Sequence, residues 1–147
     1  MKQLLFTAVI RGATPTSMLV LSFAYLPNGA FRSSLIIGLA IATVVSIWKL
    51  QGQERNAGLA GAATALGLYF TIMTGALVAE GLAHEGPGTI DDDYGSRDVT
   101  ESVYRRHLLG SAAGGGILAF LVWLFAWEAW KFATCVKADH SDYAERK

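Results

Sequence analysis

Four long apolar segments, separated by shorter polar breaks, set the pattern of hydrophobic positions along the chain. They cover about residues 4–26, 31–50, 57–83 and 99–134, and the last is apolar from about His107 onward. A hydrocarbon core of about 30 Å needs roughly 20 apolar residues in a helix, and each segment meets that need. The pattern predicts an all-α fold, an integral membrane four-helix bundle with four transmembrane helices.

The polar breaks predict how these helices connect. Pro27-Asn28-Gly29 favours a tight turn, because proline ends a helix and Asn-Gly accepts positive φ, so the first two helices should form an antiparallel hairpin. Residues 84–106 are expected to be a solvated outer loop, and residues 135–147 a cytoplasmic tail. Asp98-Val99-Thr100-Glu101 is typical of a capping box, which starts the last helix near Val99, outside the membrane. We expect one transmembrane domain over residues 1–147.

The first segment allows two other interpretations. A secretory signal peptide is disfavoured because Arg11 interrupts its apolar core and no clear small-x-small cleavage site follows. A helix lying flat over residues 1–11 would leave only Thr14 to Leu26 to cross, and about 20 Å is too short. We therefore expect a continuous helix, or one kinked at Pro15.

Composition supports a membrane environment and excludes some partners. Apolar residues make up 52% of the chain and charged residues 16%, against roughly 25% charged in a soluble domain. The formal net charge is zero, so no nucleic-acid partner is expected, and the lipid bilayer is the main surrounding. The single cysteine, Cys135, excludes an internal disulfide and a cysteine-rich metal site.

The distribution of basic residues predicts the orientation. With both termini inside (N-in/C-in), eight lysines and arginines lie on the inner side and four on the outer side, and cytoplasmic loops carry the excess of such residues. The inner group is Lys2, Arg11, Lys49, Arg55, Lys131, Lys137, Arg146 and Lys147, and the outer group is Arg32, Arg97, Arg105 and Arg106. Four tryptophans, Trp48, Trp123, Trp127 and Trp130, fall near the inner interface, where amphipathic rings prefer to lie. The expected location is a multi-pass position in the cell (inner) membrane.

Three ionisable residues inside the apolar segments are the main candidates for function: Arg11, Glu80 and Glu128. An arginine at the bilayer centre opposes insertion by about 2.5 kcal/mol or more unless it reaches the headgroups or finds a partner. We expect Arg11 either to extend to the headgroups or to pair with Glu128 and so fix the first helix against the fourth. A proton-relay or transport role for these groups is the alternative.

Metal and cofactor chemistry has only weak candidates, and no catalytic residues are predicted. Glu80 and His84 share a helix face, and His84 and His107 could in principle be axial ligands of a haem. The run Asp91-Asp92-Asp93-Tyr94-Gly95 resembles part of a calcium loop but lacks the downstream glutamate. No cofactor and no metal site is predicted, with haem as the open exception.

Small residues at four-residue spacing are the strongest pattern in the third and fourth segments. Lipid supplies no hydrophobic force between helices, so small residues that permit close backbone approach favour packing. The expected packing residues are Gly58, Gly61, Gly110, Gly114, Gly115 and Gly116. Their partners are helices of the same chain, of a second copy, or of another membrane subunit.

Function emerges only as a set of hypotheses. The first is a non-catalytic accessory or scaffolding subunit of a larger energy-transducing or transport complex, because small-residue faces are many and intramembrane charges few. The second is a small homo-oligomeric ion or solute transporter or channel that uses Arg11, Glu80 and Glu128. The third is a haem- or quinone-associated membrane anchor subunit.

Overall fold

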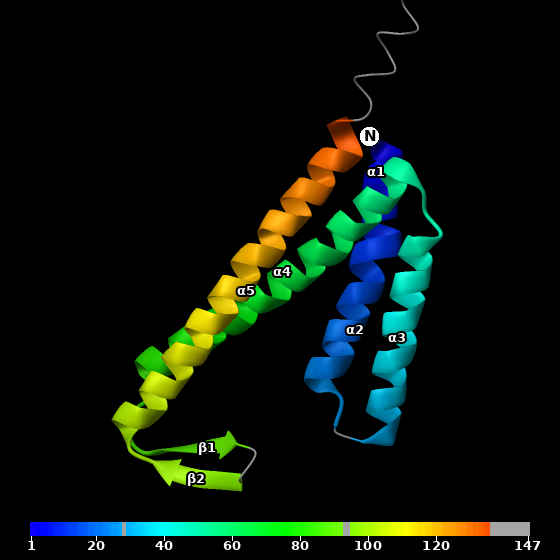
Figure 1. The fold of residues 1–147 in the computed structure, drawn as a ribbon. Helices are drawn as coiled ribbons and strands as arrows, with labels where there is room; N and C mark the ends of the chain where they lie inside the picture. The colour runs from blue at the N-terminus through cyan, green and yellow to red at the C-terminus, as the bar shows by residue number, and fades with distance from the viewer. Residues whose placement is uncertain (28, 93–94, 136–147) are drawn as a thin grey trace, which may run out of the picture. The chain divides into compact units, whose positions relative to one another are not determined.

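The computed structural model describes residues 1–27, 29–92 and 95–135. The elements, in chain order, are α1 (Lys2–Thr7), the π-helix η1 (Ala8–Ala13), α2 (Thr14–Tyr25), α3 (Ala30–Trp48), α4 (Gly52–Ala83), β1 (Gly88–Asp92), β2 (Gly95–Val99) and α5 (Glu101–Cys135) (Figure 1). Within the described residues, four helices are long and apolar enough to cross a membrane, and α1, η1 and α2 together make the first of them. The prediction of a mostly helical chain with four such helices is confirmed.

Some boundaries differ from the expected ones. Helix α4 begins at Gly52 instead of near residue 57, so its first turn is polar and includes Glu54 and Arg55. Helix α2 ends at Tyr25 and α3 begins at Ala30, and the two lie side by side (Figure 1). The middle of the predicted turn, Asn28, lies outside the described residues, as does the predicted tail after Cys135.

The first span is one continuous helix, as expected, but it widens in the middle. The backbone stays helical at Thr7 and at Thr14, and the amide of Thr14 donates to the carbonyl of Val9, five residues earlier. Proline has no N–H and its ring crowds the carbonyl four residues before it, which for Pro15 is that of Arg11. A π turn directly before Pro15 is one of the known ways for a helix to absorb such a defect. The sequence pattern did not predict η1.

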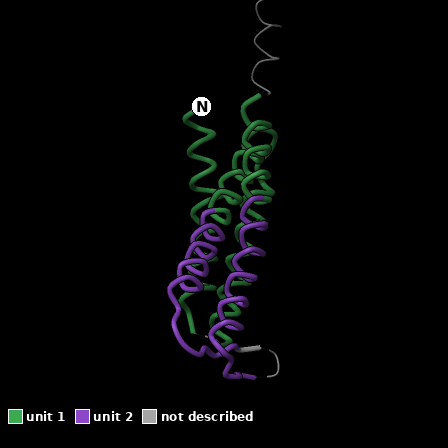
Figure 2. Tube along the Cα trace, turned by 90° about the vertical axis from the view of Figure 1, so that its left-hand side faces the viewer, with its two compact units in different colours: residues 1–67, 121–147 green, residues 68–120 purple. Residues whose placement is uncertain are grey.

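Two compact units make up the chain, and both α4 and α5 contribute to each of them (Figure 2). Unit 1 contains residues 1–67 and the C-terminal part from Leu121, and unit 2 contains residues 68–120. The buried cluster of unit 1 consists of alanines, with Ala57 and Ala133 both 0% exposed beside Ala8. The π-helix η1 and helices α4 and α5 thus pack against one another through methyl side chains.

Glycines bring the π-helix η1 and helix α4 into backbone contact inside unit 1. A Cβ atom on Gly61 would overlap the carbonyl of Ala8, and one on Gly12 would overlap the carbonyl of Gly58 and lie 2.8 Å from the amide of Ala62. Neither position can hold a side chain unless the backbones separate. Gly61 was predicted as a packing residue, whereas Gly12 was not.

We expect Gly61→Ala to destabilise the protein by about 1–3 kcal/mol, because the added methyl group must push two backbones apart. Gly38→Ala is the matched control, since Gly38 lies within helix α3 and has no neighbouring atom within 4 Å of its Cβ position. The control should be neutral or slightly stabilising, because alanine favours helix by up to about 1 kcal/mol over glycine. Unfolding midpoints in detergent measure both, and equal midpoints for the two variants would contradict the close approach.

Candidate functional site

A β-hairpin occupies the segment between α4 and α5, where only a solvated loop was predicted. Strands β1 and β2 pair antiparallel, with Gly88 opposite Val99 and Thr89 opposite Asp98. The hydroxyl of Thr89 donates to the carboxylate of Asp98 at 2.9 Å, so Asp98 belongs to the hairpin and does not cap α5. Ile90 is 6% exposed. The sequence did not predict these two strands, because cross-strand pairs stabilise a run that looks only polar. The outer, solvated position of the segment stays a prediction.

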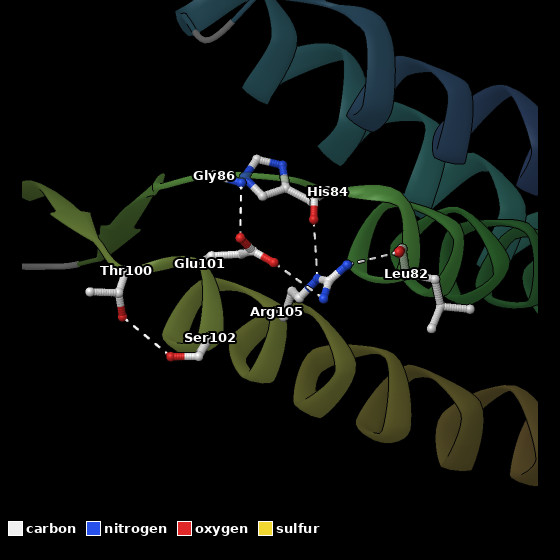
Figure 3. Close-up of polar contacts among 7 residues, drawn as sticks. All are labelled: Leu82, His84, Gly86, Thr100, Glu101, Ser102 and Arg105. Atoms are coloured by element: carbon white, nitrogen blue, oxygen red, sulfur yellow. Dashed lines mark hydrogen bonds and ion pairs between the residues drawn. The ribbon is translucent and has the colours of Figure 1, made fainter.

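Arg105 joins the end of α4 to the start of α5. Its Nε donates to the carbonyl of His84 at 3.1 Å, and its guanidinium also donates to the carbonyl of Leu82 at 3.1 Å (Figure 3). The last carbonyls of a helix lack partners within the helix, and a cation there also complements the helix dipole. Arg105 thus caps α4 from a neighbouring helix.

Glu101 extends this connection to the hairpin. Its carboxylate lies 3.2 Å from the guanidinium of Arg105 and accepts a hydrogen bond from the amide of Gly86 at 3.1 Å (Figure 3). We call Glu101, Tyr104 and Arg105, with the groups of α4 and of the segment after it that they contact, the α4–α5 clamp. The clamp ties the end of α4 and the segment before β1 to the start of α5.

Tyr104 brings together Glu80 and His84, the two residues predicted as a pair. The Tyr104 hydroxyl donates to Glu80 at 2.9 Å, and the rings of Tyr104 and His84 are 4.5 Å apart at 50°. The Nε2 atom of His84 is buried without a hydrogen-bond partner in the structure. A Cβ atom on Gly88 would lie 2.6 Å from an atom of the Tyr104 ring, so strand β1 approaches the same ring closely.

The two histidines have different surroundings. His84 has its ring contact with Tyr104, and His107 is exposed on α5. In the part of the chain that the structure describes, no group of three His, Cys, Asp or Glu side chains could hold a metal ion. The calcium-like run includes Asp93 and Tyr94, which lie outside the described residues. The haem hypothesis gains no geometric support here.

Glu128 has a partner other than the expected one. Lys131, one turn along α5, lies 2.9 Å from the Glu128 carboxylate, and its ammonium also lies 5.6 Å from the Trp127 ring centre. No ion pair between Arg11 and Glu128 forms among the described residues. Side chains three residues apart on one helix are neighbours, so the local partner needs no helix–helix contact to form. Arg11 is exposed.

The predicted packing glycines divide into those with a neighbour at the Cβ position and those without one. Gly58 and Gly61 lie within unit 1, facing Leu50 and Ala8 respectively, and Gly115 and Gly116 lie beside Thr74 within unit 2. Among the described residues, no atom outside the backbone of α5 itself lies within 4 Å of the Cβ position of Gly110 or Gly114. The described residues therefore cover part of the small-residue pattern and leave the face of α5 at these two glycines open.

Known proteins give no guide to the function. No protein-family model matches the chain, and no curated protein or solved structure is detectably similar to it. Any indication of function therefore comes from the chemistry of the sites. In the described residues the carboxylates of Glu80, Glu101 and Glu128 each have a protein partner, an arrangement that fixes structure.

We expect Arg105→Gln to loosen the hairpin, because the carbonyls of Leu82 and His84 lose their donor and Glu101 loses its ion pair. These groups are partly exposed, so the expected loss is on the order of 1 kcal/mol, or about fivefold faster amide exchange. Hydrogen exchange of residues 86–92 and 95–99, read by mass spectrometry, measures this. The matched control is Arg106→Gln at the exposed neighbouring position, and equal acceleration by the control would contradict the clamp.

Proposed function

We propose that this protein is a non-catalytic accessory or scaffolding subunit of a larger membrane complex. In this proposal the four apolar helices form a four-helix bundle with both termini on the cytoplasmic side of the cell membrane. The observation that carries the proposal is the open face of α5 at Gly110 and Gly114. Another subunit would supply the atoms missing there.

The energetic argument concerns the use of glycine in a helix. Glycine destabilises a helix interior by roughly 0.5–1 kcal/mol relative to alanine, and close approach of another helix offsets that cost. Gly115 permits such a close approach, because Thr74 lies where a side chain at Gly115 would be. No described residue makes such an approach at Gly110 or Gly114. A helix from another subunit, packed closely on this face, would offset the cost of both glycines.

The charges of unit 1 support the proposed orientation. The side chain of Gln3 donates to Glu54 at 3.0 Å, and Ala8, Ala57 and Ala133 form one cluster. The start of α1, the start of α4 and the end of α5 therefore lie at one end of unit 1 (Figure 1). This end carries Lys2, Lys49, Arg55 and Lys131, with Trp48 and Trp127. Basic residues and tryptophans of this kind favour the cytoplasmic interface.

The clamp belongs outside the hydrocarbon core in this arrangement. Helices α4 and α5 contain 32 and 35 residues, or about 48 and 52 Å at 1.5 Å per residue, and the core is about 30 Å thick. Their linked ends can therefore project into water with the hairpin. A projecting, braced hairpin gives an accessory subunit a second contact surface.

The transporter alternative is less well supported by the geometry. A relay needs ionisable groups that can exchange protons or ions along a path. Glu80 and Glu128 instead have local partners in Tyr104 and Lys131. Ion flux through liposomes that contain only this protein would favour the alternative.

We expect a preparation in mild detergent to contain a stoichiometric partner chain that Gly110→Leu and Gly114→Leu remove. A Cβ atom at either position meets no atom of the described residues outside α5, so we expect the unfolding midpoint to stay close to that of the wild type. Gly38→Leu on α3 is the control, because its position is also open, and it should keep the partner. Mass analysis of the purified complex reads the outcome. A protein that purifies alone, as a single copy, would contradict the subunit proposal.

We expect Cys135 to react from the cytoplasmic side, because the end of α5 lies with the start of α1 in unit 1. Glu85→Cys, made together with Cys135→Ser, places the only thiol beside the hairpin and should react from the opposite side. A membrane-impermeant maleimide applied to right-side-out and inverted vesicles separates the two. Labelling of both positions from one side would overturn the proposed topology.

A further inference from the structure

A groove runs between α2, α3 and α4 within unit 1. Its volume is about 590 Å³, within the range of roughly 300–1,000 Å³ that small-molecule sites occupy. The walls are mostly aliphatic, with Leu19, Val44, Ile47, Leu59 and Leu66 among the lining residues. A flexible hydrocarbon chain matches such walls.

Polar groups lie at one end of this groove. Arg55 and Asn56 come from the first turns of α4, and Trp48 closes α3 just before the connection to α4. Arg55 is exposed, and among the described residues it makes no hydrogen bond or ion pair. Trp48 is 79% exposed. An arginine, an amide and an indole at the mouth suit a headgroup that carries phosphate.

Thr16 supplies a second, independent sign of a ligand. It lines the groove, is 5% exposed, and its hydroxyl has no hydrogen-bond partner in the structure. Thr43, which also lines the groove, donates to the carbonyl of Leu39 in its own helix. Thr64, outside this groove, does the same to the carbonyl of Ala60. A buried hydroxyl without an acceptor costs free energy, so an acceptor inside the groove would stabilise the protein.

We infer that this groove binds one anionic phospholipid from the leaflet at the Arg55 end. The phosphate pairs with the Arg55 guanidinium beside the Asn56 amide, and an acyl chain lies along the aliphatic walls. The ester carbonyls, between phosphate and chain, are acceptors of the kind that the Thr16 hydroxyl lacks. Positive charge at the mouth distinguishes an anionic lipid from a zwitterionic one.

A second groove in unit 1 differs from the groove at Arg55 because it has no charged lining residue. It lies between η1, α4 and α5, has a volume of about 400 Å³, and is walled by Trp123, Trp127 and Trp130 with small residues. None of its lining residues is charged. It offers no means of choosing a headgroup, so a specific lipid is assigned only to the groove at Arg55.

The test uses the full chain, delipidated in detergent, and titrates phosphatidylglycerol against phosphatidylcholine with identical acyl chains. Native mass spectrometry counts bound lipids, and the unfolding midpoint gives the stabilisation. We expect one tightly bound phosphatidylglycerol, with at least tenfold weaker binding of phosphatidylcholine. Arg55→Gln should weaken phosphatidylglycerol about tenfold or more, the usual effect of losing a charge-assisted contact.

Lys49→Gln is the matched control, because Lys49 is a basic residue at the same end but does not line the groove. It should leave binding within about twofold. Thr16→Val gives a separate readout: it should weaken lipid binding while leaving the lipid-free protein at least as stable, because an unsatisfied hydroxyl is removed. Equal binding of the two lipids, or equal losses in the Arg55 and Lys49 variants, would overturn the inference.

Discussion

The contact between the backbones of η1 and α4 is the constraint on which unit 1 depends. Apolar helices in lipid gain little by hiding apolar surface from one another, so their association relies on van der Waals contact at short range. Gly12 and Gly61 permit that range, since a Cβ atom at either position would overlap the backbone of the other helix. The contact places the start of α1 beside the start of α4, where Gln3 meets Glu54. It also positions α2, and therefore one wall of the groove between α2, α3 and α4, because α2 continues directly from η1.

How far the sequence predicts this structure depends on the kind of interaction. Long apolar runs indicated the helices, because in lipid every backbone polar group must be paired within a helix or a closed barrel. The pattern of small residues indicated Gly61 and Gly115 but not Gly12, although Ala8, Gly12 and Thr16 recur at four-residue spacing. The clamp was missed because it joins residues far apart in the sequence. Glu101, Tyr104 and Arg105 share one face of α5, and that spacing was the available signal.

The polar groups of the α4–α5 clamp stabilise the end of α4 and the start of α5. Arg105 and Glu101 satisfy carbonyl and amide groups that α4 and the segment after it leave unpaired, and Glu80 accepts from Tyr104. Two of the features that lack a partner among the described residues are used in the proposals above: the glycine face of α5 at Gly110 and Gly114, and the hydroxyl of Thr16 in the groove. We propose another helix as the partner of the first and a lipid as the partner of the second.

The most direct test of this account is cross-linking of α1 to α4 in lipid. Gln3→Cys and Glu54→Cys, made together with Cys135→Ser and reconstituted in liposomes, place two thiols on side chains that meet at 3.0 Å in the structure. A short bifunctional thiol reagent should link them in high yield, and adding Gly61→Leu should abolish the link because the backbones then separate. Two reactive thiols that never link, or a link that survives Gly61→Leu unchanged, would contradict the central claim that glycine contact holds these helices together.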